Sequence, residues 1–452
     1  MFKNFMRGVV VAFVAVAGVA SAWAAIPIEH WTQPGGARVY LVQSRSLPMV
    51  DVQIDFDAGS RRDPADKAGL AGVTAMMASR GIRGGTAGPA LDENALGEAW
   101  ADLGASFGGS AGSDRMGFSL RSLTYPDLLP RVITLAARQL GEPLFPADVW
   151  EREREQLVAS IRESDTRPAT AANKAFSTAV YGSHPYGYQV TGTSLSGIGV
   201  DDMRAFYQRA IRPCRATVSI VGDMSREQAD ALVTGLMARL AAQPEDAACA
   251  PWPPVAQVAP LTQPAATQSI PFDSAQAHVL IGQPGIRRND PDYLALTVGN
   301  YVLGGGGFVS RLYAQVREKR GLSYSVHSYF SPGLHAGAFS VGLQTRPDQA
   351  AQAITVSRGI VEQFVREGPT EQELQAAKSN LIGGFALRLD SNRKLLDNVA
   401  HIAWNGLPLD YLDTWTAAVD RVTVADVKAA FARVLRPETM VTVVVGARDK
   451  TP

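Results

Sequence analysis

The sequence predicts an α+β protein of two homologous domains, each a mostly antiparallel sheet packed with helices. Three observations predict this fold class. At 452 residues the chain is too long for one hydrophobic core. The second half repeats the pattern of the first half at a constant offset, and a segment rich in proline and alanine separates them. Two such halves on a linker can face each other and enclose a cavity.

The repeat is clearest at the end of each half. Residues 200–223 read "VDDMRAFYQRAIRPCRATVSIVGD", and residues 424–447 read "VADVKAAFARVLRPETMVTVVVGA", which align without gaps at an offset of 224 (424 minus 200). Each copy predicts an amphipathic helix, an Arg-Pro pair that ends it, and a strand of β-branched residues. A second correspondence links "GSRRDP" at Gly59 to "GIRRNDP" at Gly285, offset by 226 to 227. The duplication therefore covers most of the chain.

The first 24 residues have the layout of a cleavable secretory signal. Two basic residues precede an apolar run over residues 8–20, and small residues then allow cleavage after Ala22 or Ala24. The run is short beside the roughly 20 residues of a membrane span, although an uncleaved anchor is the alternative. No later segment has a transmembrane pattern. We expect an exported, periplasmic protein with no membrane span after removal of residues 1–24.

The domains follow this signal in order. The first domain covers residues 25–245, a Pro/Ala-rich linker covers 246–267, and the second domain covers 268–452. Each half opens with strands, continues through several long helices and closes with a strand. Strands at both ends of a helical block are typical of α+β domains.

Charge and cysteine content narrow the classes of function. Lys plus Arg and Asp plus Glu number 43 each, so the formal net charge is zero and no basic patch favours binding to nucleic acid. Cys214 and Cys249 lie in a compartment that permits disulfides, which favours a bridge over two unpaired thiols. Two sulfurs without neighbouring histidines make a poor zinc site.

Three further stretches carry a resemblance to a known family. They are "DAGSRRDPADKAGLAGVTAMMASRG" from Asp57, "YGSHPYGYQVTGT" from Tyr181 and "VLGGGGFVSRLYAQVREKRGLSYSVHS" from Val302. The first stretch is similar to that family's strand, loop and metal-binding helix. The second is similar to its His-Pro-Tyr-Gly segment, and the third to its glycine-rich loop with the following helix. The whole mature chain resembles the pitrilysin or insulinase family of zinc metalloproteases, in particular its short two-domain members such as mitochondrial processing peptidase subunits. The resemblance implies two domains arranged as one half of a clamshell.

In active members of that family, the metal helix carries H-x-x-E-H. Two histidines one turn apart reach one ion, and the glutamate takes a proton from the metal-bound water. The resemblance places Gly72 and Met76 at the two histidine positions and Ala75 at the general base. Glycine and alanine offer no side-chain donor, and a thioether suits copper(I) better than zinc.

The third ligand of the family is a glutamate in a later helix, seven residues after another glutamate. Counting from Glu153 in "WEREREQLVASIRESD" leads to Ser160, while Glu163 lies three residues further on and is not equivalent. The remaining candidates are six histidines with no pair three or four apart: His30, His184, His278, His327, His335 and His401. We expect no metal and no cofactor in this chain.

The first half lacks the metal ligands of the family, whereas the second half resembles the family at its substrate-binding residues. Family members bind the substrate backbone with an arginine and a tyrosine seven residues apart, and "REKRGLSY" places these at Arg317 and Tyr324. Both side chains are hydrogen-bond donors suited to a developing oxyanion. Arg317 could instead pair with an acid and Tyr324 could lie in the core, and Arg320 is a weaker candidate for the arginine role.

A run of glycines precedes this pair. A phosphate-binding P-loop would need a following Gly-Lys-Ser/Thr, which "GGGGFVSRLY" lacks, and a bare flexible turn is another reading. The resemblance favours a loop that borders the cavity and lets the backbone of a substrate or partner approach closely. The glycines concerned are Gly304, Gly305, Gly306 and Gly307.

Two hypotheses of different class follow. In the first, this chain is the non-catalytic, substrate-binding subunit of a heterodimeric exported zinc metallopeptidase. It would supply Arg317 and Tyr324 to a homologous catalytic partner that carries the zinc motif and cleaves peptides. In the second, it is a scaffold or peptide-binding protein with no role in catalysis, as structural subunits of respiratory complexes are. An active hydrolase based on other residues is disfavoured because no Ser/His/Asp or Cys/His set is evident.

Overall fold

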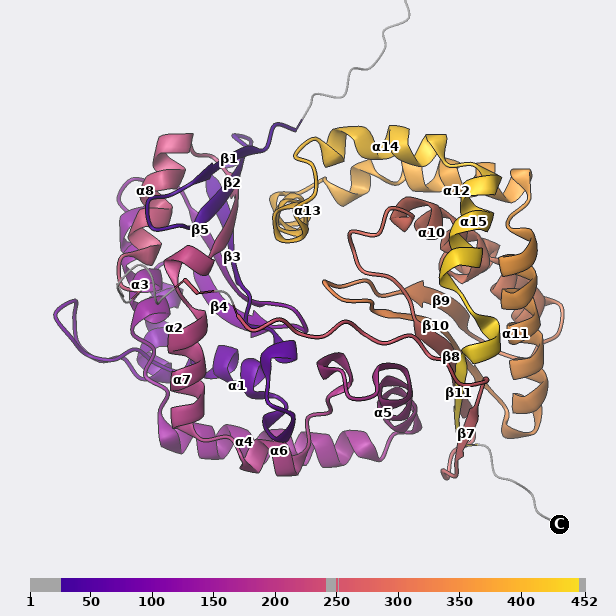
Figure 1. Cartoon of the computed structure of the whole chain (residues 1–452). Coiled ribbons are helices and arrows are strands. Elements are labelled where there is room, and N and C mark those ends of the chain that lie inside the picture. The colour runs from indigo at the N-terminus through magenta and orange to yellow at the C-terminus, as the bar shows by residue number, and fades with distance from the viewer. Residues whose placement is uncertain (1–25, 241–248, 251, 447–452) are drawn as a thin grey trace, which may run out of the picture.

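The computed structural model describes residues 26–240, 249–250 and 252–446 and contains two halves, each built on its own sheet (Figure 1). The signal expected at residues 1–24 lies outside the described residues. The sheet of the first half has six strands in the order β1-β2-β6-β3-β5-β4, and only β2 and β6 pair in parallel. Its strands are β1 (Glu29–Thr32), β2 (Arg38–Gln43), β3 (Met49–Phe56), β4 (Ser106–Ala111), β5 (Met116–Leu123) and β6 (Thr217–Gly222).

The sheet of the second half has five strands in the order β7-β11-β8-β10-β9. Only β7 and β11 pair in parallel, so both sheets are mostly antiparallel, as the sequence predicts. Its strands are β7 (Thr267–Ile270), β8 (Ala277–Pro284), β9 (Val326–Phe330), β10 (Ala338–Thr345) and β11 (Val441–Val445).

Helices pack on both sheets. Those of the first half are α1 (Leu70–Met77), α2 (Glu93–Asp102), α3 (Leu129–Gly141), α4 (Ala147–Asp165), α5 (Pro168–Tyr181), α6 (Gly192–Ser196), α7 (Val200–Ala210) and α8 (Arg226–Met237). Those of the second half are α10 (Tyr293–Asn300), α11 (Ala350–Glu367), α12 (Glu371–Gly383), α13 (Asn392–Asn405), α14 (Tyr411–Arg421) and α15 (Val424–Val434). None of the helices among the described residues combines the length and apolar character needed to cross a membrane.

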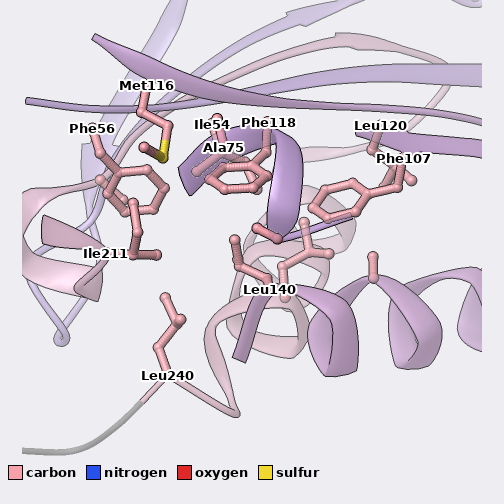
Figure 2. Packing of buried hydrophobic residues seen from close by; sticks show 14 of the residues in the cluster. Ile54, Phe56, Ala75, Phe107, Met116, Phe118, Leu120, Leu140, Ile211 and Leu240 are labelled. Atoms are coloured by element: carbon pink, nitrogen blue, oxygen red, sulfur yellow. The ribbon is translucent and has the colours of Figure 1, made fainter. Parts of the chain in front are cut away.

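The core of the first half lies between its sheet and its own helices. Phe56 and Phe118 project from neighbouring strands, with ring centroids 6.2 Å apart, and Phe107 stacks on Phe118 (Figure 2). Burying one such side chain stabilises the fold by about 2–3 kcal/mol. Ala75 of α1 lies in this same cluster beside Phe118.

The duplicated segments adopt the same structure. α7 and α15 each lead through a short 3₁₀ turn, at Pro213–Arg215 and Pro437–Thr439, into the strands β6 and β11. The prediction that strands lie at the two ends of each half is incomplete, because the hairpins β4–β5 and β9–β10 occupy the middle. The glycines of "SFGGSA" in β4 obscure its strand pattern in the sequence.

Each half lends one helix to the other. α5 packs on β8 and β11 of the second half, where Phe176 and Val180 contact Val443 and Val445. α13 packs on β3 and β6 of the first half, and Figure 1 shows it between the two halves. Because a sheet buried on both faces needs helices on both faces, the exchange covers the second face of each sheet. The boundary between the halves in sequence is therefore not a boundary in space.

The segment between the halves runs along the first half. Residues 249–250 and 252–266 contain no helix or strand. Trp252 packs near Phe206, and the guanidinium carbon of Arg209 lies 4.2 Å from its ring centroid. Cys214 and Cys249 form a disulfide with their Cα atoms 6.0 Å apart. These contacts hold the start of the segment against the connection between α7 and β6.

Candidate functional site

Helix α1 retains the local structure that a metal helix would need. Its start is fixed by Asp63, whose carboxylate accepts hydrogen bonds from the backbone N–H groups of Gly69 and Ala71, both at 2.9 Å. Gly69 has a φ of +106°, which favours glycine. Burial raises the pKa of Asp63 to about 6, against the lowering effect of these hydrogen bonds. The helix is thus held in place by a buried cap.

The positions predicted for the metal ligands hold none of the usual zinc ligands. Gly72 is exposed, and a Cβ atom built there would meet no other atom within 4 Å. Met76, one turn further, is half-buried. Ala75, at the position of the general base, is fully buried in the core. Ser160 lies exposed on α4. Across residues 26–240, 249–250 and 252–446, no three His, Cys, Asp or Glu side chains are grouped so that they could hold a metal ion.

The two glutamates near Ser160 have other partners. Glu153 is buried and accepts hydrogen bonds or ion pairs from Arg80 at 3.0 Å and Arg152 at 3.1 Å. Glu163 is exposed and pairs with Arg167 one turn along the same helix. Both carboxylates are therefore occupied by arginines.

The structure brings Arg317 and Tyr324 together in the second half. Arg317 lies on the π-helical turn η7 (Tyr313–Glu318), and Tyr324 lies just before β9. The guanidinium carbon of Arg317 is 4.5 Å from the ring centroid of Tyr324 and 4.7 Å from that of Tyr313, to whose hydroxyl it also donates a hydrogen bond. Phe308 packs edge-on against Tyr313. We refer to Phe308, Tyr313, Arg317 and Tyr324 as the Arg317 cluster.

Two simpler readings of this pair do not hold. Among the described residues, no carboxylate lies within 4.0 Å of the Arg317 guanidinium, so it is not a surface ion pair. Tyr324 is 80% exposed, so it is not a core residue. Arg320 instead bonds to the backbone and side-chain oxygens of Gln315, at 2.8 and 2.9 Å.

The glycine-rich loop has mainly internal reasons for its composition. Gly304 is buried, and a Cβ atom there would collide with Ser328 of β9. Gly305 and Gly306 would collide with Asn300 and Tyr301 of the preceding turn. Only Gly307, with a φ of +60°, has open space around it. Gly304 is thus inside the fold, whereas Gly305 and Gly307 lie on the exposed side of the loop.

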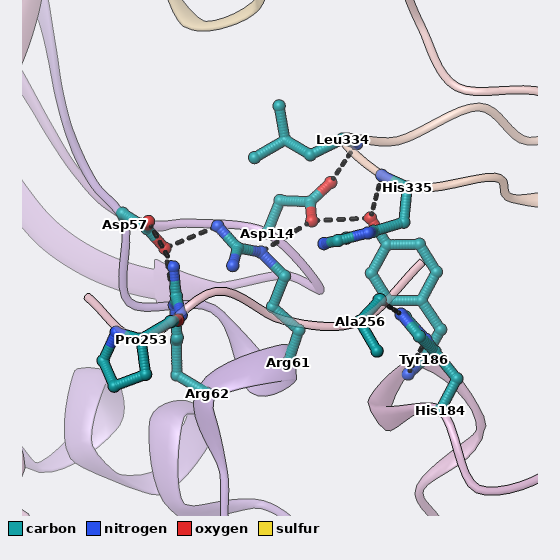
Figure 3. A network of polar contacts seen from close by, with 10 residues as sticks. All are labelled: Asp57, Arg61, Arg62, Asp114, His184, Tyr186, Pro253, Ala256, Leu334 and His335. Atoms are coloured by element: carbon teal, nitrogen blue, oxygen red, sulfur yellow. Dashed lines mark hydrogen bonds and ion pairs between the residues drawn. The ribbon is translucent and has the colours of Figure 1, made fainter. Parts of the chain in front are cut away.

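Sequence reasoning missed a polar network that joins the two halves (Figure 3). Asp114, in the turn between β4 and β5, accepts hydrogen bonds from Arg61 at 3.0 Å, from the Tyr186 hydroxyl at 2.6 Å and from the backbone N–H of Leu334 at 2.9 Å. The Tyr186 hydroxyl in turn accepts from the backbone N–H of His335 at 3.2 Å. The "GSRRDP" and "SHPYG" motifs thus meet at the loop after β9.

Histidines that are scattered in the sequence also meet there. The rings of His184 and His335 lie edge to face, with centroids 5.1 Å apart. His184 Nε2 donates to the backbone carbonyl of Ala256 at 3.0 Å, and its Nδ1 accepts from the backbone N–H of Tyr186. Both imidazoles have their pKa lowered by burial. They serve contacts between the halves rather than a metal.

Comparison with known proteins agrees with this architecture. Residues 38–194 match the family model described as Insulinase (Peptidase family M16), and residues 197–381 match the one described as Peptidase M16 inactive domain. The crystal structure of a peptidase M16 inactive domain from Pseudomonas fluorescens is 33% identical, with a TM-score of 0.86. The similarity covers 93% of this chain and 98% of that one. The chain belongs to peptidase family M16. The family resemblance and the two-domain α+β fold are confirmed.

The relatives of this M16 chain include proteins named as proteases and one named as a non-peptidase homologue. An uncharacterised zinc protease of Streptomyces coelicolor is 27% identical over 428 residues, covering 94% of this chain and 90% of that protein. The non-peptidase homolog YmxG of Helicobacter pylori is 25% identical over 396 residues, covering 85% and 86%. In this M16 chain, glycine, alanine and methionine at positions 72, 75 and 76 supply no usual zinc ligand and no general base.

Proposed function

We propose that this M16 chain is the non-catalytic, substrate-binding subunit of a heterodimeric zinc metallopeptidase. Its partner is a homologous chain that carries H-x-x-E-H and the zinc. Arg317 and Tyr324 bind the peptide backbone at the partner's metal and donate hydrogen bonds to the oxyanion formed during hydrolysis. The chain is not an enzyme on its own.

One observation carries this proposal. The first half has no donor at the positions of the metal ligands and the base, whereas the second half holds an arginine and an exposed tyrosine in contact, with no acid on the arginine. A guanidinium and a phenol, each positioned on a developing oxyanion, can lower the barrier by about 3 kcal/mol each. Such groups act equally well when another chain supplies the metal.

The surface around the pair supports binding to another molecule. Phe308, whose ring contacts Tyr313 of the Arg317 cluster, is 72% exposed, and the adjacent Val309 is 74% exposed. Grouped large apolar side chains on a surface are typical of a binding site. A peptide or the partner chain would cover them, and the arginine between the rings would bind a backbone carbonyl.

We also propose that the protein acts in the periplasm, exported by the signal at residues 1–24. The disulfide between Cys214 and Cys249 supports this location, because disulfides persist in oxidising compartments.

The proposal is tested by reconstitution. The chain is co-expressed with an M16 homologue of the same genome that carries H-x-x-E-H, and cleavage of a quenched fluorescent peptide is measured for each chain alone and for the mixture. We expect a stable complex that cleaves, and little or no cleavage by either chain alone. Cleavage by this chain alone would contradict the proposal. A complex no faster than the partner alone would favour the scaffold hypothesis.

A further inference from the structure

A cavity of about 350 Å³ lies between the two halves, and no residue of α1 or of the Arg317 cluster lines it. Its walls are the turn 112–115 between β4 and β5, Tyr181 and Tyr186, the loop 331–333 after β9, and the end of α13 with His401 and Trp404. We call it the interdomain cavity. Its volume is at the lower end of the range usual for small-ligand sites.

The hydrogen-bonding state of His401 follows from its neighbours. Nε2 of His401 accepts a hydrogen bond from Nε of Arg288 at 2.6 Å, so the proton of the neutral ring is on Nδ1. The amide nitrogen of Asn405 lies 3.4 Å from Nδ1, and it already donates to the backbone carbonyl of His401 at 2.9 Å. Two donors cannot bond to each other. His401 therefore has an N–H group without an acceptor.

The positive charge of Arg288, which donates to His401, has no counter-charge among the described residues. Arg288 is only 5% exposed, and its side chain bonds to the neutral groups of His401 and Tyr411. Within the described part of the chain, no carboxylate lies within ion-pair distance of it. A buried guanidinium without a counter-charge is costly, and an anion nearby would offset that cost. Burial, with the charges of Arg288 and Arg115, lowers the pKa of His401 to about 4.

Other donors line the same cavity. Arg115 uses one N–H group to bind Asp55 at 2.7 Å, and its guanidinium carbon lies 5.7 Å from the Trp404 ring centroid. The ring of Trp404 forms part of the wall, but its indole Nε1–H is buried and offers no donor to the cavity. The acid in the wall, Asp114, already accepts three hydrogen bonds, one of them from the Arg61 guanidinium, which offsets its charge. The donors that the cavity offers to a ligand are therefore the remaining N–H groups of Arg115 and Nδ1–H of His401.

We propose that the interdomain cavity binds a carboxylate, held by Nδ1–H of His401 and the guanidinium of Arg115. One unmatched positive charge suits a monoanion better than a phosphate dianion. The rest of the volume, bordered by Trp404 and the two tyrosines, accommodates a small organic acid or the last residues of a peptide. The inference concerns this chain alone and does not depend on a partner or on cleavage.

The test uses the isolated full chain with isotope-labelled histidine, whose six side chains give a simple NMR spectrum. His401→Gln assigns the signal of His401. Acetate, acetyl-alanyl-alanine and the C-terminal amide of that peptide are titrated at pH 7. We expect the free acid to shift the His401 signal saturably and to raise its pKa, and the amide to bind at least about 10-fold more weakly. Equal binding of acid and amide, or no saturable shift, would overturn the proposal.

Two variants form a matched pair. Arg115→Gln and Arg121→Gln each remove the partner of a buried aspartate on β3, Asp55 or Asp51, but only Arg115 lines the cavity. We expect Arg115→Gln to weaken binding of the free acid at least about 10-fold and Arg121→Gln to leave it unchanged. Equal affinities in the two variants would also overturn the proposal. Acetate binding as tightly as the peptide identifies small acids as the ligand class, and a tighter peptide identifies peptide C-termini.

Discussion

Helix α1 and the Arg317 cluster differ in what each has kept. α1 keeps its cap, its buried face and its place against the sheet, but its side chains supply no usual zinc ligand and no general base. The Arg317 cluster is built on an irregular π-helical turn, yet it holds a half-buried arginine against an exposed tyrosine. Packing accounts for the structure of α1 without any catalytic side chain, whereas packing does not explain an exposed tyrosine held against an arginine.

The comparison is tested most strongly at Ala75. Because Ala75 lies in the core beside Phe118, Ala75→Glu would bury an unpaired carboxylate and lower the free energy of unfolding by about 4 kcal/mol. Urea denaturation measures this value, and Gly72→Glu on the exposed face of the same helix is the control. If Ala75→Glu were as stable as the wild type, α1 would still have room for a catalytic base.

The second test removes the chemistry of the Arg317 cluster. In the complex with the catalytic partner, we expect Arg317→Ala to lower the rate of peptide cleavage about 100-fold and Tyr324→Phe to lower it about 10-fold. The complex should remain assembled, as size-exclusion chromatography would show. Arg320→Ala is the control, because Arg320 bonds only to Gln315. Unchanged rates in both Arg317→Ala and Tyr324→Phe would remove the pair from the mechanism.

The cap of α1 predicts a dependence of stability on pH. The pKa of Asp63 is about 6 in the folded protein and 3.8 in the reference state, so the folded state binds the proton more tightly. Protonated Asp63 therefore contributes its full stabilisation below pH 4. As the pH rises through 6 this contribution is lost, and the free energy of unfolding falls by at most about 3 kcal/mol. Asp63→Asn should flatten this part of the curve of melting temperature against pH. A wild-type curve with the opposite slope in this range, unchanged by Asp63→Asn, would contradict the assignment.

The smallest effect is expected at Gly72. Because Gly72 is exposed in mid-helix with free space around it, Gly72→Ala should raise the free energy of unfolding by about 1 kcal/mol. Gly69→Ala, at a φ of +106°, should lower it. A loss of stability in Gly72→Ala would show that the former ligand position has acquired a contact of its own.

Much of the fold could be predicted from the sequence because it repeats. The helix and strand of α7–β6 and α15–β11 are recognisable from apolar periodicity and the Arg-Pro pair alone. The hairpins β4–β5 and β9–β10 were missed because glycine and serine weaken their alternation. The exchange of α5 and α13 could not be predicted, since an amphipathic pattern shows that a face is buried but not against which sheet.

The candidate site, like the fold, could be predicted only in part from the sequence. The empty ligand positions and the Arg317–Tyr324 pair could be named from the family resemblance, because each motif lies within a short stretch of sequence. The network at Asp114 joins residues that lie 53 and 72 positions from it, and the contact to Leu334 spans 220 positions. Only the fold brings such residues together. The contact of Arg288 with His401, which lies on the exchanged helix α13, could not be predicted for the same reason.

Metal analysis of the purified proteins tests the central claim most directly. Native mass spectrometry of this chain, of its partner and of their complex counts the zinc ions on each. We predict none on this chain, one on the partner and one on the complex, with that zinc lost when a histidine of the partner's motif is replaced. One tightly held zinc on this chain alone would contradict the account.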